Sequence, residues 1–138
     1  MTGYLLDTNV ISETRLRRPH GALLTWIGAQ QEQQLFLSAV SLGELQAGVE
    51  ATRRQDSAKA NEIEVWIEQL VASYQVLPMD AVCFREWARL MDRKPDRLSE
   101  DAMIAAAARV NGLIVATRNE RDFIHFGVRI LNPFKNIS

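Results

Sequence analysis

Short apolar runs along the chain alternate with longer stretches in which apolar residues recur at helical spacing. The short runs predict strands at Tyr4–Leu6, Leu35–Leu37, Val76–Leu77, Leu113–Ala116 and Val128–Leu131. The periodic stretches predict helices over 20–33, 41–52, 57–74, 80–91 and 99–110, with Asp80 and Ser99 as N-caps and Gly112 as the last stop. Strands separated by helices indicate an α/β protein with a parallel sheet, right-handed crossovers and helices on both faces.

The 138 residues have the usual size of one domain, and we predict a single domain over 1–138. Neither an internal repeat nor a low-complexity tract divides the chain. The charged, proline-containing segment 93–97 is expected to be a loop inside the domain.

Net charge and cysteine content limit the binding partners and the cellular compartments that suit this protein. The formal net charge is −1, so no overall positive field attracts nucleic acid or membranes, and such affinity needs local patches or metal ions. Cys83 is the one cysteine, which excludes an intrachain disulfide and suits a reducing compartment. No apolar run approaches the roughly 18 residues of a membrane span, and no signal-peptide pattern is present. We therefore expect a cytoplasmic protein without membrane association.

Polar residues from four distant segments are predicted to meet at one edge of the sheet. Asp7 ends the first strand, and Glu44 lies in the first turn of the helix that leaves the second. Asp101 lies in the first turn of the helix before the fourth strand, and Asn119 and Asp122 follow that strand. All of these positions fall at the carboxyl edge, where open α/β sheets bind their ligands.

Several carboxylates in one place raise one another's pKa values or require a cation. Neither His20 nor His125 has the spacing of a metal motif, so the ligands would be oxygen atoms, which suit Mg²⁺ or Mn²⁺ but not zinc. Such an ion can activate a nucleophile and offset the charge of a phosphate. The cluster therefore predicts metal-dependent phosphodiester hydrolysis.

Asp7 and Glu44 each have a purely structural interpretation as well. Asp7 could simply begin a turn, although a buried strand end is an unfavourable place for a bare carboxylate. Ser41 and Glu44 have the spacing of a capping box. Glu44 also shares a helix face with the small residues Ala47 and Gly48, which indicates that a neighbour or a metal site approaches that face closely.

The other two acids also have alternatives. Glu100 and Asp101 both lie in a helix first turn, where the helix dipole favours acids. Helical spacing groups Asp101 with Ala105 and Ala108 on a face that packs closely on the sheet, whereas Glu100 can point away. Asp101 is thus the stronger ligand candidate. Asp122 could instead cap a short helix or pair with a neighbouring arginine.

Hydrogen-bonding residues flank the acids. Thr8, Asn9, Thr117 and Asn119 are candidates to orient the carboxylates, with ordinary turn and cap chemistry as the alternative. Asn119 could also replace or assist Asp122 as a ligand.

Basic and aromatic residues give weaker signals. Arg93, Lys94 and Arg97 precede Asp101 and could bind nucleic-acid phosphates, although a solvated surface is the default. Three tryptophans lie on helical patterns and suit a core or an interface better than base stacking: Trp26, Trp66 and Trp87.

Four motifs occur in order between residue 4 and Pro133: Leu5-Leu6-Asp7-Thr8-Asn9, Ser41-Leu42-Gly43-Glu44-Leu45, Asp101-Ala102-Met103-Ile104-Ala105-Ala106 and Thr117-Arg118-Asn119-x-x-Asp122-Phe123. Together they resemble the successive motifs of PIN-domain proteins, above all the VapC and FitB toxins of type II toxin–antitoxin systems. The resemblance implies a PIN-like three-layer sandwich, with a central, mostly parallel sheet of about five strands flanked by helices.

The same resemblance implies an activity and partners. Asp7, Glu44 and Asp101 carry over as metal ligands and Asp122 as the fourth acid of an Mg²⁺- or Mn²⁺-dependent endoribonuclease, although family members differ at the fourth position. A toxin of this kind is expected to cleave RNA, to form a homodimer, to be inhibited by a small cognate antitoxin and to meet DNA only through that antitoxin.

Two other functions are compatible with parts of the pattern. Phosphotransfer domains also place an Asp at a strand end, but Asn9 stands where phosphatases of that kind have a second Asp, and no Lys follows the fourth strand before Lys135. A non-catalytic, toxin-like module that regulates transcription together with its antitoxin is the second alternative. The four acids argue against it, because such a module has no need of their mutual repulsion.

Overall fold

Five parallel strands form one sheet with β1 at its centre. The computed structural model describes residues 1–135, so residues 136–138 of the predicted domain lie outside the described part. The strands are β1 (Tyr4–Leu6), β2 (Leu35–Ser38), β3 (Gln75–Leu77), β4 (Ile114–Ala116) and β5 (Ile130–Leu131). Their order is β3-β2-β1-β4-β5, and every neighbouring pair is parallel. This confirms the predicted sheet, although the fifth strand is shorter than the sequence suggests.

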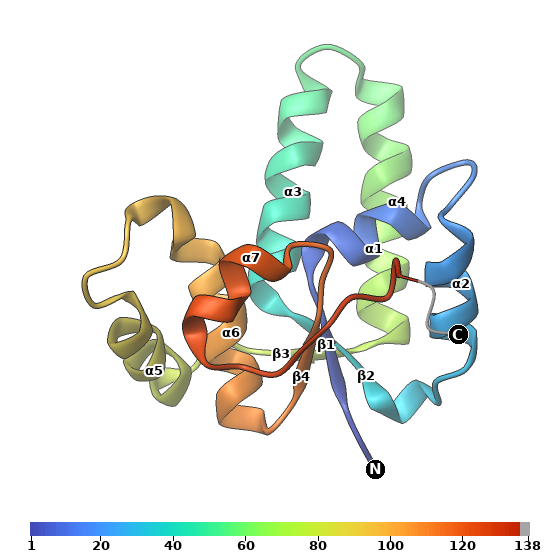
Figure 1. The fold of residues 1–138 in the computed structure, drawn as a ribbon. Coiled ribbons are helices and arrows are strands. Elements are labelled where there is room, and N and C mark those ends of the chain that lie inside the picture. Colours follow the sequence, from blue (N-terminus) through green and yellow to red (C-terminus); the bar gives the residue numbers. More distant parts are fainter. Residues whose placement is uncertain (136–138) are drawn as a thin grey trace.

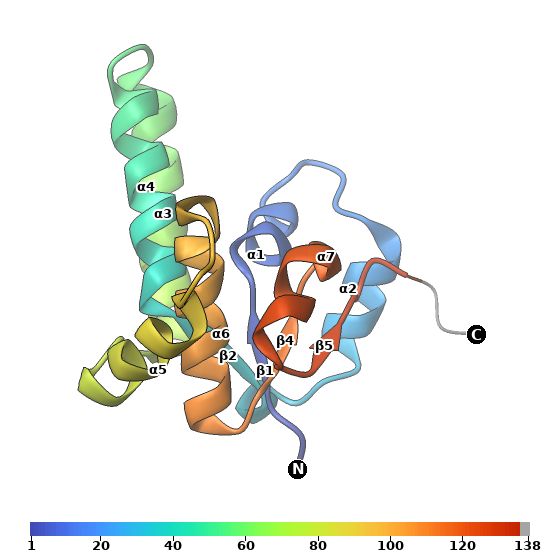
Figure 2. The ribbon, with the colours of Figure 1, turned by 60° about the vertical axis from the view of Figure 1, so that its left-hand side comes forward.

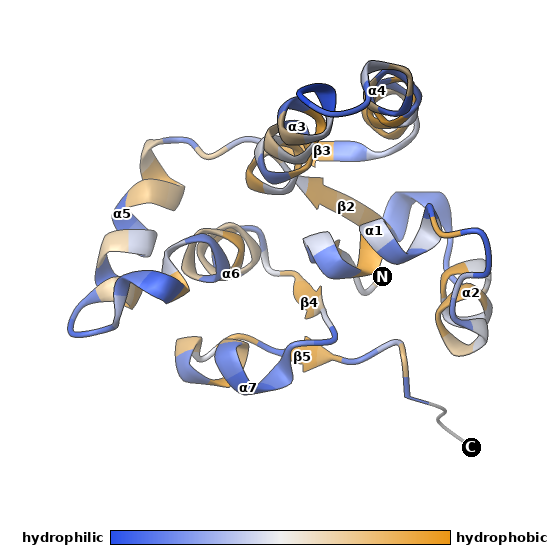
Figure 3. Ribbon diagram, turned by 90° about the horizontal axis from the view of Figure 1, so that it is seen from above, coloured by the Kyte–Doolittle hydropathy of each residue, from blue (hydrophilic) through white to orange (hydrophobic). Residues whose placement is uncertain are grey.

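Alternating side chains of the strands divide the core between the two faces of the sheet. Leu5 and Val115 pack with α5 (Ala81–Met91) and α6 (Ser99–Asn111). Leu6 and Leu37 face the opposite way, towards α1 (Thr8–Thr14) and α2 (Gly21–Gly28). Figure 3 shows the apolar strands between these two helical layers, and Figure 2 shows the same layers from the side. The result is the expected three-layer sandwich.

A helical hairpin of α3 (Ala39–Arg53) and α4 (Ser57–Ser73) lies next to β3 (Figure 3) and projects beyond the carboxyl ends of the strands (Figure 1). Its two helices pack through Val49, Ala60 and Ile67. The hydroxyl of Ser38 caps α3 by accepting a 3.1 Å hydrogen bond from the Val40 N–H. The predicted helix start at Ser41 is therefore wrong, and the Ser41–Glu44 capping box does not form.

Helix ends differ from the sequence prediction at several other places. Helix α1 was not predicted at all, and the helix expected over 20–33 ends at Gly28 and is followed by a separate turn, η1 (Glu32–Gln34). Leu98, not Ser99, is the N-cap of α6, and Gly112 ends that helix as predicted, in the left-handed conformation (φ 66°). The remaining short elements are η2 (Asp96–Leu98), α7 (Glu120–Phe123) and η3 (Ile124–Phe126).

The three tryptophans are half-buried and pack against the two main core clusters, which agrees with a packing role. Among residues 1–135, no helix combines the length and the apolar character that a bilayer crossing requires.

Candidate active site

Asp7 lies between the ends of the two central strands. It directly follows β1, and its N–H donates a 2.9 Å hydrogen bond to the carbonyl of Ala116 at the end of β4. Its side chain is 4% exposed. The carboxylate accepts hydrogen bonds from the Thr8 N–H (2.8 Å, to Oδ1) and from the Thr117 hydroxyl (2.7 Å, to Oδ2). Asp7 is thus a buried carboxylate in a fixed orientation.

Asn119 links the acids that follow β4 to the acid at the start of α6. Its Nδ2 lies 3.0 Å from Asp122 Oδ2 and 3.3 Å from Asp101 Oδ2. Its backbone N–H donates to the Thr117 hydroxyl at 2.9 Å, and that hydroxyl in turn donates to Asp7. A continuous hydrogen-bonded chain therefore joins Asp7, Asp101 and Asp122 at the carboxyl edge, as the element order predicts.

Glu44 lies in the second turn of α3, near the same edge of the sheet, and is exposed. The Thr8 hydroxyl lies 2.9 Å from Glu44 Oε1 and 2.8 Å from the buried Ser41 hydroxyl. The Thr8 hydroxyl has one proton and an ionised carboxylate can only accept, so Thr8 donates a hydrogen bond to Glu44 and accepts one from the Ser41 hydroxyl. The sequence pattern suggested only a capping role for Ser41, and no signal in the spacing links it to Thr8.

The pKa values of the acids reflect burial and mutual repulsion. Burial raises the pKa of Asp7 and of Glu44. Burial, followed by the negative charges of Asp7 and Asp122, raises the pKa of Asp101 to about 6. Asp122 differs, because hydrogen bonds from Asn119 and Arg97 lower its pKa. A cation placed between Asp7 and Asp101 would relieve this repulsion.

Glu100 influences the pKa values of the site acids, which the sequence does not predict. The residue is exposed, yet its charge contributes to the raised pKa values of both Asp101 and Glu44. Glu100 thus adds to the negative potential of the site, although its helix position allows it to point away.

The donor atoms at this edge fit Mg²⁺ or Mn²⁺. They are carboxylate, hydroxyl and amide oxygens, the ligands of hard cations. Within the part of the chain that the structure describes, no three Asp, Glu, His or Cys side chains are close enough to bind one ion together. Mg²⁺ is commonly held by one or two carboxylates and keeps several waters, so a site with Asp7 and Asp101 as the innermost acids is sufficient.

The other predicted site residues fall into two groups. Arg97 Nη1 lies 3.3 Å from Asp122 Oδ1, so this arginine contacts the site. Asn9 accepts a 3.3 Å hydrogen bond from the Arg118 N–H and thereby holds the loop after β4. In residues 1–135 no hydrogen bond or ion pair joins Asn9, Arg93 or Lys94 to any of the four acids.

The face of α3 with small residues remains open within the chain. Nothing lies within 4 Å of the position that a Cβ would take at Gly48. This face instead borders a groove of about 360 Å³ that continues from Thr8 and Glu44 along α1 and the α3–α4 hairpin, past Arg15 and Trp66. Helix α1 approaches this face at Glu44 through Thr8, but at Gly48 residues 1–135 do not provide the close neighbour that the sequence predicts.

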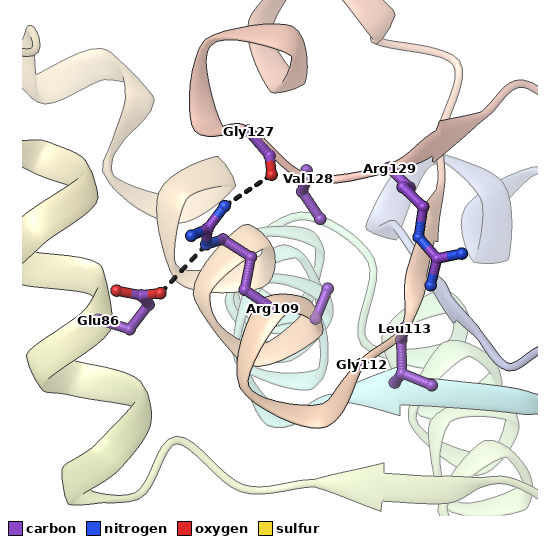
Figure 4. Close-up of a pocket in the computed structure, with 8 residues that line it drawn as sticks. Glu86, Arg109, Gly112, Leu113, Gly127, Val128 and Arg129 are labelled. Atoms are coloured by element: carbon purple, nitrogen blue, oxygen red, sulfur yellow. Dashed lines mark hydrogen bonds and ion pairs between the residues drawn. The ribbon is translucent and has the colours of Figure 1, made fainter.

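A second pocket, of about 250 Å³, lies at the opposite, amino edge of the sheet (Figure 4). Arg109 crosses it and donates to Glu86 at 3.1 Å and to the Gly127 carbonyl at 2.6 Å. These contacts join α5, α6 and the turn before β5. Arg109 therefore connects elements of the fold in this pocket, which is separate from the acidic site.

Comparison with known proteins places this chain in a family. The family model of the PIN domain matches residues 4–128. The plasmid stability protein StbB of Pseudomonas syringae pv. tomato is 38% identical, with 95% of this chain and 98% of that protein aligned. The VapC ribonuclease Y4jK of Sinorhizobium fredii is 36% identical, over 95% of this chain and 97% of that protein.

A solved structure gives the same assignment. The FitAcB crystal structure from Neisseria gonorrhoeae has a chain with a TM-score of 0.83 and 28% identity, covering 95% of this chain and 98% of that one. The family model, the related sequences and this structure agree with one another. The chain therefore belongs to the PIN domain family, in the group that includes the VapC and FitB proteins.

Proposed function

We propose that this protein is an Mg²⁺- or Mn²⁺-dependent endoribonuclease and the toxin of a toxin–antitoxin pair. The observation that carries the proposal is the hydrogen-bonded chain from Asp7 through Thr117 and Asn119 to Asp101, at the ligand-binding edge of the sheet. The name of the Sinorhizobium relative, a VapC ribonuclease, supports RNA as the substrate.

Each acid has a role in this proposal. When bound, the metal ion supplies charge neutralisation for the phosphate and activation of water. Asp7 and Asp101 would hold the ion, and Glu44 and Asp122 would add negative charge beside it. The hydrogen bond from Thr117 orients Asp7 and favours its ionised form, Thr8 does the same for Glu44, and Asn119 restrains Asp101.

Partners are also part of the proposal. Structures of FitAB, of VapBC proteins and of a toxin–antitoxin complex are similar to this chain, and three of them are bound to DNA. We infer a small cognate antitoxin that inhibits the nuclease and carries it to DNA, and we place the protein in the cytoplasm with its RNA substrates. The open groove beside Thr8 and Glu44 is available to such a partner or to RNA.

The protein is proposed to be a homodimer. Val82 and Phe84 on α5 are 58% and 44% exposed, which is unfavourable for apolar side chains of a monomer in water. A single monomeric mass at micromolar concentration in light scattering would contradict this assembly.

Cleavage of RNA tests the proposed function directly. Purified protein, free of its partner, is incubated with total RNA and with a short single-stranded RNA in the presence of Mn²⁺, Mg²⁺ or EDTA. Cleavage that requires metal is expected, and Asp101→Asn should abolish it. Glu68→Gln removes an exposed charge from α4 and should cleave like the parent.

Cleavage that persists in EDTA or in Asp101→Asn would contradict the metal-dependent mechanism. Absence of cleavage by the parent with either metal would favour the alternative, a toxin-like module that regulates transcription in complex with its antitoxin.

A further inference from the structure

One cation contacts the acidic site. Among the ion pairs in residues 1–135, the pair between Arg97 and Asp122 (3.3 Å) is the one that includes any of the four site acids. The Arg97 side chain is 67% exposed, whereas that of Asp122 is 20% exposed. The guanidinium therefore lies at the mouth of the site, on its solvent side.

The backbone next to Arg97 is anchored in the core, although the side chain itself is largely exposed. Arg97 lies in η2, and the next residue, Leu98, is 2% exposed and part of the core. The Leu98 N–H donates to the Pro95 carbonyl at 3.1 Å, and the indole of Trp87 donates to the Ser99 carbonyl at 3.1 Å. The exposed side chain of Arg97 therefore extends from an anchored backbone position immediately before α6, the helix that carries Asp101.

The guanidinium has unused hydrogen-bonding capacity. It carries five N–H donors, and in the described chain one contact, to Asp122 Oδ1, is present. The other oxygen of Asp122 accepts from Asn119, so Asp122 keeps a partner if Arg97 leaves. Exposed ion pairs of this kind stabilise a protein very little, whereas a guanidinium binds a phosphate through two parallel charge-assisted hydrogen bonds.

The site needs such a group on this side. Its four acids and Glu100 repel the phosphates of RNA, and the net charge of −1 provides no compensating field. Arg93 and Lys94 lie in the same loop but form no contact with the acids in the described structure. Arg97 is the residue of this basic loop that is already in place.

We propose that Arg97 is a phosphate-binding residue of the active site, whose guanidinium rests on Asp122 in the RNA-free protein and transfers to an RNA phosphate when substrate binds. This inference rests on the proposed ribonuclease function. Asp122 then holds Arg97 in position beside the acids until RNA arrives.

Kinetics of three variants test the role. Arg97→Gln removes the charge, Arg97→Lys keeps the charge but not the two parallel donors, and Arg129→Gln removes an exposed arginine at the opposite edge of the sheet. With a short RNA and Mn²⁺, kcat/KM is expected to fall about 100-fold in Arg97→Gln. The fall should be about 10-fold in Arg97→Lys, because the bidentate geometry is lost. Arg129→Gln should match the parent.

RNA binding without metal gives a second readout, which a merely structural role would not change. In EDTA, the affinity for a fluorescent single-stranded RNA is measured over a series of KCl concentrations. Loss of one phosphate contact lowers the slope of log affinity against log salt by about 0.7, which is expected for Arg97→Gln but not for Arg97→Lys or Arg129→Gln. Because Asp122→Asn frees the guanidinium, Arg97→Gln should weaken binding more in that background than in the parent.

Arg97→Gln with the parent's kcat/KM and salt slope would overturn the inference. If Arg97→Gln lacks a cooperative melting transition, Arg97→Lys decides, and a parent-like kcat/KM in that variant overturns the inference. If the parent cleaves no RNA but Arg97→Gln still lowers the salt slope, the proposed nuclease function fails while the phosphate contact stands.

Discussion

The Thr117 hydroxyl donates a 2.7 Å hydrogen bond to Asp7 Oδ2 and so joins the ends of the two central strands, β4 and β1. Thr117 is fully buried, and Asp7 is 4% exposed. Burial raises the pKa of Asp7, and the hydrogen bond from Thr117 acts against that rise. Thr117 therefore favours the ionised carboxylate that a metal ion requires.

Replacing Thr117 should affect both stability and cleavage. Thr117→Val keeps the shape but leaves Asp7 Oδ2 and the Asn119 N–H without their partner, while Asp7 Oδ1 keeps the Thr8 N–H, so the free energy of unfolding should fall by about 1–3 kcal/mol. Cleavage should fall about 10- to 100-fold, the usual effect of losing a group that orients a metal ligand. Denaturant unfolding and kcat/KM measure the two effects. Thr117→Ser, which keeps the hydroxyl, is the control and should cleave RNA nearly as well as the parent.

Asp101 should make the metal-free protein less stable as the pH rises. Its pKa of about 6 in the folded protein exceeds the ordinary value of 3.8, so between these limits the folded state keeps a proton that the unfolded chain has lost. The contribution of Asp101 to stability therefore falls from pH 4 to pH 6 and is lowest above that range. In EDTA at pH 7, Asp101→Asn should have a higher melting temperature than the parent, by about 2–4 °C for each kcal/mol of electrostatic repulsion that the substitution removes. At pH 4 the two melting temperatures should differ little.

Asp122 should show the opposite pH dependence of stability to Asp101. Its pKa is lowered by Asn119 and Arg97, so its stabilising contribution is present above its ordinary pKa and is lost as the pH falls through the folded-state pKa. Asp122→Asn should thus melt slightly lower than the parent at pH 7. Equal shifts for both variants at every pH would show that the two carboxylates are not differently placed.

The sequence predicts the convergence of the acids because that convergence depends on element order alone. A residue after a parallel strand and a residue in the first turn of the preceding helix lie at the same edge, whatever the details of packing. Asp7 and Asp101 obey this rule, and the neighbours of Asp101 on its helix face, Ala105 and Ala108, are fully buried as expected. This part of the site needs no knowledge of side-chain contacts.

Features that depend on contacts between distant segments could not be predicted in this way. Helix α1 has β-branched and polar residues with weak helix propensity, and it forms because Asp7 caps it and Val10 and Ile11 are buried. The contact between Thr8 and Glu44, and that between Arg97 and Asp122, join positions far apart in the chain. Their geometry follows from packing of the helices, which spacing does not encode.

Arg109 should matter for stability and not for catalysis. It donates to Glu86 on α5 and to the carbonyls of Phe126 and Gly127, which lie before β5 at the amino edge. Arg109→Ala leaves these acceptors without their donor, and the free energy of unfolding should fall by about 1–2 kcal/mol, since the site is partly solvated. Denaturant unfolding measures this, and kcat/KM under native conditions should equal that of the parent. A large loss of cleavage with unchanged stability would mean that this edge contributes to function.

Mn²⁺ should stabilise the folded protein through the acids. An ion that binds only the folded state adds about 2.7 kcal/mol at a concentration of 100 times its Kd, which for a chain of this size raises the melting temperature by several degrees. Asp101→Asn removes one of the two innermost carboxylates, so its rise with Mn²⁺ should be much smaller, even though it melts higher than the parent in EDTA. Glu68→Gln should show the full rise, because its exposed position on α4 is outside the acid cluster. Thermal melts at increasing Mn²⁺ concentration measure all three, and an equal rise in Asp101→Asn would place the bound ion elsewhere on the protein.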